Sequence, residues 1–136
     1  MLHPAKTPKA PYVTQTLKGA SGPFIAASDY MKVLPESIAQ WVPGKLVALG
    51  TDGFGRSENR ASLRDFFEVD AKHIVLATLH ALAGEKSGEK KDSTEGVSAK
   101  LLEKAVRDLG IDPEKRNPAR SSVSYTHLTL PTIYSV

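Results

Sequence analysis

The pattern of apolar and polar residues in the first half of the chain predicts two short buried strands with a helix between them. Residues 24–28 (FIAAS) and 46–51 (LVALGT) are short apolar runs bounded by turn residues, as in strands that are buried on both faces. Pro35 should start or kink the intervening helix. The positions with helical spacing are Met31, Leu34, Ile38, Trp41 and Val42. Because parallel strands need a crossover, the pattern predicts a parallel βαβ unit.

Helix-start signals recur outside this unit. Ser57, Asp70 and Ser98 each precede a stretch with helical apolar spacing and are predicted to cap it. A short helix should also follow Pro11, and Gly110 should end the last one. With two apolar strands and several helices, the fold class is α/β.

Composition divides the chain into five segments. The charged, low-complexity stretch GEKSGEKKDSTEG cannot bury apolar surface, so it is interpreted as a flexible linker. The predicted segments are a connector (1–22), a βαβ core (23–83), the linker (84–97), a C-terminal helix with its end (98–122) and a tail (123–136).

The tail, VSYTHLTLPTIYSV, is interpreted as foreign to the natural protein. Its first ten residues are the codon-by-codon translation of a transposon-based sequencing adapter. Such a segment is set aside before fold reasoning, although its uncharged, aromatic composition imitates a strand. Tyr125, His127 and Tyr134 are therefore removed from the candidate site residues.

The two predicted strands do not suffice for a stable sheet. We therefore expect a fragment of a larger chain, whose sheet is incomplete at its N-terminal side and in which Met1 is an internal methionine.

Charge and residue usage narrow the function classes. The net charge of +3 comes from lysines and arginines interleaved with acids, whereas a nucleic-acid face needs clustered cations and stacking aromatics. The chain has no cysteine and no apolar run long enough to span a bilayer. These features predict no nucleic-acid partner, no membrane association and a cytoplasmic location.

The densest motif is a glycine-rich turn between the second strand and the following helix. It consists of Thr51, Asp52, Gly53, Phe54, Gly55, Arg56 and Ser57. Backbone N–H groups in such a turn can hold a phosphate, but the spacing matches neither a dinucleotide fingerprint nor a P-loop. We favour a structural turn, and a small α/β domain that binds an anionic ligand here remains the alternative. A purely structural interaction module is a third possibility.

Other titratable residues do not form a recognisable constellation in the sequence. His73 and His80 are seven residues apart, which is too far for one metal ion, and are interpreted as ordinary polar-face histidines. Asp65, Glu68 and Asp70 are spaced as a helix end and the following cap, not as a converging acid and base pair. We accordingly predict no catalytic, cofactor-binding or metal-binding residue.

Several motifs together give the chain a family resemblance. GPFIAASDYMK, LGTDGFGRSENR and FEVDA are the most specific, and MLHP, PYV, WVP and GID..K.NPA extend the likeness to about residue 120. The chain resembles the C-terminal end of the homodimeric pyruvate dehydrogenase decarboxylating component, a family similar to the transketolases. It departs from that family in Pro35 and in the long insertion at Gly84 to Gly96.

The resemblance implies a partial three-layer αβα sandwich with a mainly parallel sheet, as in a transketolase C-terminal domain. It also implies oxidative decarboxylation of pyruvate on thiamine diphosphate, and acetylation of the lipoyl group of the dihydrolipoyl acetyltransferase component. Thiamine diphosphate and Mg²⁺ would be held across the homodimer interface by domains that this chain lacks. The fragment alone is expected to be inactive and to support dimerisation, with the turn at residues 51–57 serving in packing and subunit contact.

Overall fold

The computed structural model describes residues 7–85 and 97–121. The elements in chain order are α1 (Tyr12–Thr16), β1 (Phe24–Ala27), α2 (Val33–Glu36), the 3-10 helix η1 (Ala39–Trp41), β2 (Leu46–Leu49), α3 (Arg60–Phe66), α4 (Ala71–Glu85), α5 (Ala99–Asp108) and the 3-10 helix η2 (Pro118–Arg120). The predictions for residues 86–96 of the linker and for the tail at 123–136 lie outside the described residues.

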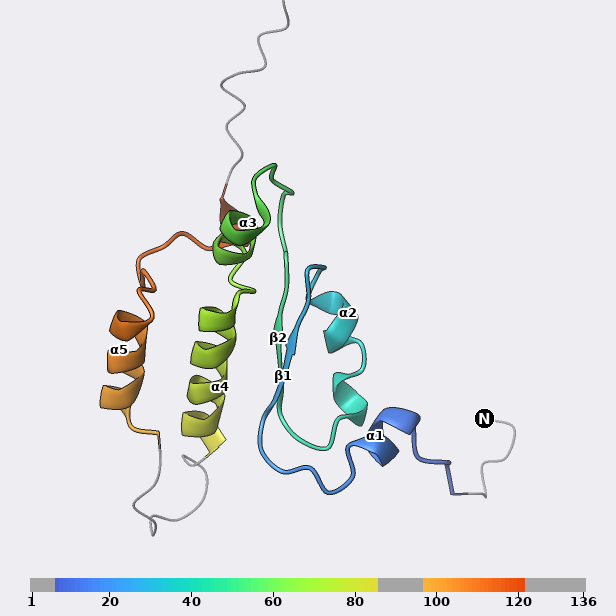
Figure 1. Cartoon of the computed structure of the whole chain (residues 1–136). Coiled ribbons are helices and arrows are strands. Elements are labelled where there is room, and N and C mark those ends of the chain that lie inside the picture. Colours follow the sequence, from blue (N-terminus) through green and yellow to red (C-terminus); the bar gives the residue numbers. More distant parts are fainter. Residues whose placement is uncertain (1–6, 86–96, 122–136) are drawn as a thin grey trace, which may run out of the picture.

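The strands β1 and β2 form a parallel pair, with Phe24 opposite Leu46 and Ala27 opposite Leu49. The chain crosses between them through α2 and η1, which confirms the predicted βαβ unit. In Figure 1, α4 lies on one side of the sheet with α5 outside it, and α1 and α2 lie on the other side. This helix–sheet–helix order confirms the α/β class and agrees with a partial three-layer sandwich.

Proline divides the crossover differently from the prediction. The helix α2 begins at Val33, so Pro35 is its third residue and neither starts nor kinks it. Proline is tolerated there because the first N–H groups of a helix have no intrahelical acceptor. The helix ends one residue later at Glu36, and η1 follows as a separate turn.

Helix starts follow local hydrogen bonds. Ser57 is not a cap: α3 begins at Arg60, and Asn59 caps it by accepting the Ser62 N–H at 2.9 Å. Asp70 and Ser98 cap as predicted, accepting the N–H groups of His73 at 3.1 Å and Leu101 at 3.3 Å. The helix α4 also continues through Gly84 to Glu85, so the predicted linker cannot begin at residue 84.

The helices α3 and α5 end with the same hydrogen-bond pattern. After α5, Gly110 has a φ of 62°, and the Ile111 N–H reaches back to the Val106 carbonyl at 3.0 Å. After α3, Glu68 has the same φ of 62°, and the Val69 N–H reaches the Arg64 carbonyl at 2.9 Å. Both ends are Schellman motifs, but at Glu68 the left-handed position holds a residue with a side chain.

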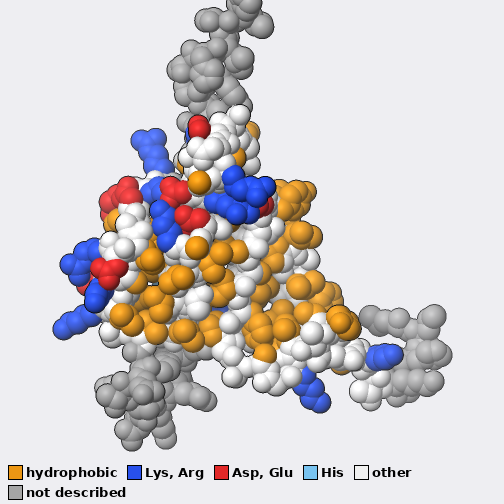
Figure 2. Space-filling view, viewed as in Figure 1, with side chains coloured by type: hydrophobic (Ala, Val, Ile, Leu, Met, Phe, Trp, Pro, Cys, Tyr) orange, Lys and Arg blue, Asp and Glu red, His pale blue; other side chains and the backbone are white. Residues whose placement is uncertain are grey.

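Few apolar side chains are buried within the described ranges. Phe67, Val69 and Ala81 form the buried apolar set, and no large side chain there is fully enclosed. By contrast, apolar side chains on α1, α2 and η1 face solvent; we refer to this set as the α1–η1 apolar residues. They are Tyr12, Val33, Leu34, Ile38 and Trp41. Figure 2 shows hydrophobic side chains over the region of α2 and η1, while charged side chains gather around α3 and α5.

Candidate functional site

The two segments that leave the carboxyl ends of the strands are joined by hydrogen bonds. The Thr51 N–H donates to the Tyr30 carbonyl at 2.9 Å, and the Thr51 hydroxyl donates to the Asp29 carbonyl at 3.3 Å. In return, the Lys32 N–H donates to Asp52 Oδ1 at 3.0 Å. The two motifs AASDYMK and LGTDGFGRS therefore meet in space and hold each other in place.

Gly50 is required for this close approach. A Cβ at this position would lie 2.5 Å from the Tyr30 carbonyl oxygen and 2.8 Å from the Lys32 nitrogen. Both neighbours are backbone atoms fixed by the hydrogen bonds between the two segments, so they cannot move aside cheaply. Glycine at residue 50 is thus a packing requirement of the strand ends.

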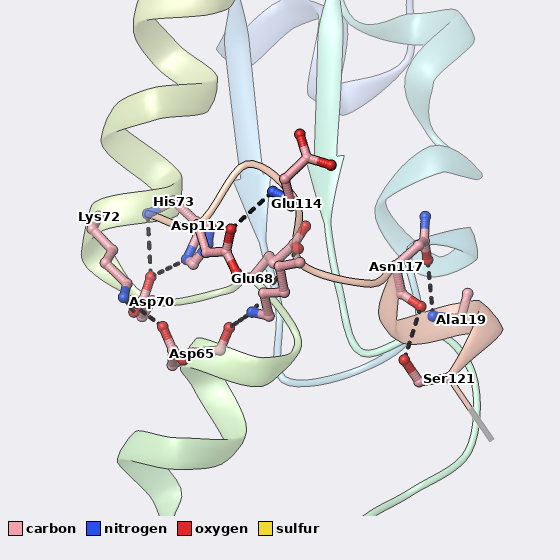
Figure 3. A network of polar contacts seen from close by, with 11 residues as sticks. Asp65, Glu68, Asp70, Lys72, His73, Asp112, Glu114, Asn117, Ala119 and Ser121 are labelled. Carbon is pink, nitrogen blue, oxygen red and sulfur yellow. Dashed lines mark hydrogen bonds and ion pairs between the residues drawn. The ribbon is translucent and has the colours of Figure 1, made fainter. Parts of the chain in front are cut away.

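The first half of the glycine-rich turn packs against the C-terminal segment. Gly53 has a φ of 97°, and a Cβ there would come within 2.9 Å of Ala119 Cα. The opposing segment is itself fixed, because Asn117 Oδ1 accepts the Ala119 N–H at 2.9 Å (Figure 3). Asp52 and Gly53 are therefore in contact with other segments of the chain, Asp52 with Lys32 and Gly53 with Ala119.

Three other residues of the turn line a cavity. A cavity of about 380 Å³ lies between the strand ends and α3, and Thr51, Gly55 and Arg56 contribute to its wall. Arg60 and Arg64 of α3 contribute as well. Phe54, 72% exposed, and Ser57, also exposed, are not among the lining residues. The seven predicted turn residues thus divide into a packing part, a cavity-lining part and two solvent-facing side chains.

Two of the residues that line this cavity form an ion pair. Arg64 donates to both carboxylate oxygens of Asp29, from Nη2 to Oδ2 at 2.7 Å and from Nε to Oδ1 at 3.2 Å. The hydrogen bond from Arg64 lowers the pKa of Asp29, and the same contact raises the pKa of Arg64. This fork-shaped pair connects the end of β1 to α3, a connection that sequence spacing did not suggest.

Arg56 lies over an aromatic ring. Its guanidinium carbon lies 4.2 Å from the centroid of the Phe66 ring, in a cation–π arrangement. Phe66 in turn packs edge-on against Phe67, with ring centroids 5.0 Å apart.

A second cluster bears on two of the sequence interpretations. Asp65 and Asp70 do mark a helix end and the following cap, but their carboxylates also approach His73, with potential ligand atoms of the three residues all within 4.8 Å of one another. His73 is buried and its Nδ1 lies 2.5 Å from Asp70 Oδ1, so it is not a polar-face residue. His80, in contrast, is exposed.

Lysine side chains already neutralise this cluster, as Figure 3 shows in part. Lys72 Nζ lies 2.5 Å from Asp65 Oδ1 and 4.0 Å from Asp70 Oδ2. The Lys72 hydrogen bond lowers the pKa of Asp65 and raises that of Lys72. A cation would have to displace this ammonium group, so the arrangement is a polar network that fixes the α3–α4 corner.

Lys115 completes the corner from a distant part of the sequence. Its Nζ donates to the Asp65 carbonyl, lies 3.9 Å from Glu68 Oε1 and sits 5.8 Å from the Phe66 ring centroid. The fifty-residue separation from Asp65 left no local signal by which sequence reasoning could have found it.

The described residues offer binding groups more than reacting ones. The first cavity is lined by three arginines and by Thr51, whose hydroxyl donates to the Asp29 carbonyl. Within residues 7–85 and 97–121, no serine or threonine hydroxyl is hydrogen-bonded to a histidine, the pairing that an activated nucleophile needs. In the same ranges, no helix is long and apolar enough to cross a membrane.

Comparisons with known proteins agree with the family resemblance of the sequence motifs. Residues 5–70 match the family of transketolase-like TK C-terminal domains. A pyruvate dehydrogenase E1 component of Pseudomonas aeruginosa is 51% identical over 118 residues, which cover 86% of this chain and 12% of the relative. Those of Escherichia coli (strain K12) and Mycobacterium tuberculosis are each 43% identical, over 119 and 113 residues, covering 87% and 83% of this chain and 12% of each relative. The chain therefore spans about an eighth of the length of these relatives.

Proposed function

The chain belongs with the transketolase-like C-terminal domains of the pyruvate dehydrogenase E1 component, and on this premise we propose that it is the C-terminal region of such an enzyme. The complete enzyme would decarboxylate pyruvate on thiamine diphosphate and transfer the acetyl group to the lipoyl group of a dihydrolipoyl acetyltransferase. The observation that carries the proposal is the 51% identity over 86% of the chain.

In this proposal the chain contributes structure, and the cofactor is held elsewhere. Thiamine diphosphate would supply the carbanion chemistry for decarboxylation. Its Mg²⁺ calls for oxygen ligands in octahedral geometry. The one described cluster with converging carboxylates adds an imidazole and is occupied by the Lys72 ammonium group. These residues do not fit the metal, so no step of the reaction is assigned to them.

Exposed apolar surface supports a role in assembly. The sheet has two strands in the described ranges, both with a free edge, and Trp41 is 41% exposed. A further cavity of about 390 Å³ is lined by residues of β2, α4 and α5, mainly by apolar groups such as Val47, Leu76 and Val106. Protein interiors are normally close-packed, so we propose that the rest of the enzyme and its homodimer partner cover these surfaces.

The turn at residues 51–57 has a defined place in this role. Asp52 accepts a hydrogen bond from the Lys32 N–H in the segment after β1, and Gly53 packs closely against Ala119 in the C-terminal segment. We propose that Asp52→Ala in the complete enzyme lowers stability or dimerisation before it lowers turnover. A large loss of turnover with the dimer and cofactor binding intact would contradict this structural role.

A chimera tests the proposed function. Residues 7–121 replace the matching segment of the Pseudomonas aeruginosa E1 component, and pyruvate decarboxylation, cofactor binding and dimerisation are measured. We expect a dimer that binds thiamine diphosphate and turns over pyruvate, whereas a deletion of the segment should lose dimerisation and activity. The isolated 136-residue chain, supplied with thiamine diphosphate and Mg²⁺, should show no decarboxylation.

Two outcomes would contradict the proposal. One is turnover of pyruvate by the isolated chain, which would place the catalytic groups within it. The other is a chimera that folds and dimerises but leaves thiamine diphosphate chemistry inactive, which would show that this segment serves a different enzyme.

A further inference from the structure

We propose that the cavity at the carboxyl ends of β1 and β2 binds the carboxylate or phosphate group of a small organic anion through Arg56 and Arg60. The cavity lies outside the ends of two parallel strands, where open α/β sheets generally bind ligands. Its volume of about 380 Å³ falls in the ordinary range of small-molecule sites. This inference is independent of pyruvate decarboxylation, because it concerns binding alone.

The distribution of charge in the cavity favours an anion. Three arginines line it, against the carboxylates of Asp29 and Glu58. Asp29 is engaged by Arg64 in the two-point pair, so it offers little charge to a ligand. The guanidinium group of Arg60 makes no hydrogen bond or ion pair with the other described residues, although its charge contributes to lowering the pKa of Asp29. A planar guanidinium group presents paired N–H donors that match carboxylate and phosphate oxygens.

Arg56 is held in a position suited to the same ligand. Its guanidinium carbon lies 4.2 Å from the centroid of the Phe66 ring, a cation–π contact that restrains the side chain. Such a restraint reduces the conformational entropy that an arginine loses when it binds. Apolar residues, namely Leu63, Phe67 and Val69, also line the cavity. The chemistry is therefore that of an anionic group attached to a small carbon body, which would lie against these side chains.

Heteronuclear NMR of the 136-residue chain tests the proposal directly. Inorganic phosphate and acetate are titrated in separate experiments, each against sodium chloride at the same ionic strength. We expect saturable shifts at the amides of Gly55 and Arg60 with phosphate, with acetate or with both. The stronger of the two identifies the anionic group that the site prefers.

Substitutions at Arg60 decide whether these shifts report the cavity. Arg60→Gln should weaken binding about tenfold, because one charged hydrogen-bonding partner is lost. Arg107→Gln, a change of the same kind on α5, should leave binding unchanged. If Arg60→Gln lowers the helical circular dichroism signal, Arg60→Lys keeps the charge and should still weaken binding, because the fork-shaped donor pair is lost.

Asp29→Asn should change the affinity for the anion in the opposite direction from Arg60→Gln. It removes the carboxylate that engages Arg64, so phosphate or acetate should bind several-fold more tightly. The proposal is overturned if sodium chloride alone produces the same shifts, or if Arg60→Gln and Asp29→Asn both bind like the parent chain.

Discussion

The strand-end region, where the segments after β1 and β2 meet α3, differs from the α1–η1 side of the molecule in how its groups are paired and covered. At the strand ends, backbone hydrogen bonds, the Arg64–Asp29 pair and the Lys72–Asp65 pair join segments from four parts of the chain. On the other side, Tyr12 is 83% and Leu34 58% exposed. The few connections there include the hydrogen bond from the Thr14 hydroxyl to the Trp41 carbonyl at 2.6 Å.

The difference shows which parts of this fold the described residues complete by themselves. Polar and backbone contacts satisfy the strand ends locally, so that region has a defined shape without a partner. The α1–η1 apolar residues are between 41% and 83% exposed, so the described ranges cover them only in part. A chain of this size gains only a small net stability from such a core, so single changes should have visible effects.

The largest expected effect comes from the small core itself. Phe67 is 8% exposed, so Phe67→Ala should cost about 3–5 kcal/mol, enough to unfold a marginally stable chain. Phe54→Ala is the matched control and should cost less than about 0.5 kcal/mol. Amide dispersion in an NMR spectrum distinguishes the two outcomes. Equal tolerance of both changes would mean that the buried cluster does not hold the strand-end region.

Next in size is the close approach at Gly50. Gly50→Ala would place a methyl group against fixed backbone atoms and should destabilise the chain by about 2–4 kcal/mol. At Gly55 a Cβ would meet no atom within 4 Å, so Gly55→Ala should change stability by less than about 0.5 kcal/mol. Urea denaturation followed by circular dichroism measures both. Similar midpoints for the two variants would argue against the interlocked strand ends.

The polar network at the α3–α4 corner should have a smaller, pH-dependent effect on stability. Because the folded state lowers the pKa of Asp65, the stabilisation is present above the unfolded value near 3.8 and is lost as pH falls through the folded value. Stability should therefore decline below about pH 4, and Asp65→Asn should make that decline shallower. Thermal melts between pH 3 and 7 test this, with Asp108→Asn on α5 as the control. If stability falls with pH as steeply in Asp65→Asn as in the parent chain, the Asp65–Lys72 pair does not stabilise the α3–α4 corner.

The smallest effect on folding should come from the uncovered side. Leu34→Ser should change the free energy of unfolding by less than about 0.5 kcal/mol, because the side chain is already solvated. It should, however, reduce self-association measured by sedimentation velocity, because it removes exposed apolar surface. Val69→Ser, at a buried position, should show the reverse and cost about 1.5–3 kcal/mol. A large loss of stability in Leu34→Ser would show that this side is packed.

Sequence patterns predicted what short-range forces decide. Apolar runs located both strands to within two residues. Asp70 and Ser98 marked the starts of their helices, because capping depends on neighbouring N–H groups. The error at Ser57 has the same origin: Asn59 is an equally good cap two residues later, and spacing alone did not separate them. The left-handed Glu68 went unnoticed because helix ends of this type are usually recognised by glycine.

The candidate site could be predicted only in part. The glycine-rich turn was evident, but the division of its residues between packing and a cavity depends on η2 and on α3. Arg64–Asp29 and Lys115–Asp65 join residues far apart in the chain, and their pairing follows from topology that no local pattern encodes. The convergence of Asp65, Asp70 and His73 needs the turn after α3, which spacing along a helix does not describe.

Residue-resolved hydrogen exchange of the 136-residue chain tests most directly whether the strand-end region closes by itself and the α1–η1 side does not. We predict that amides in β1, β2 and the hydrogen bonds between the strand ends, such as that of Thr51, exchange at least about a hundredfold more slowly than those of Tyr12–Thr16 and Val33–Trp41. Equal protection of both regions would contradict this prediction, because the uncovered helices would then share the stability of the core.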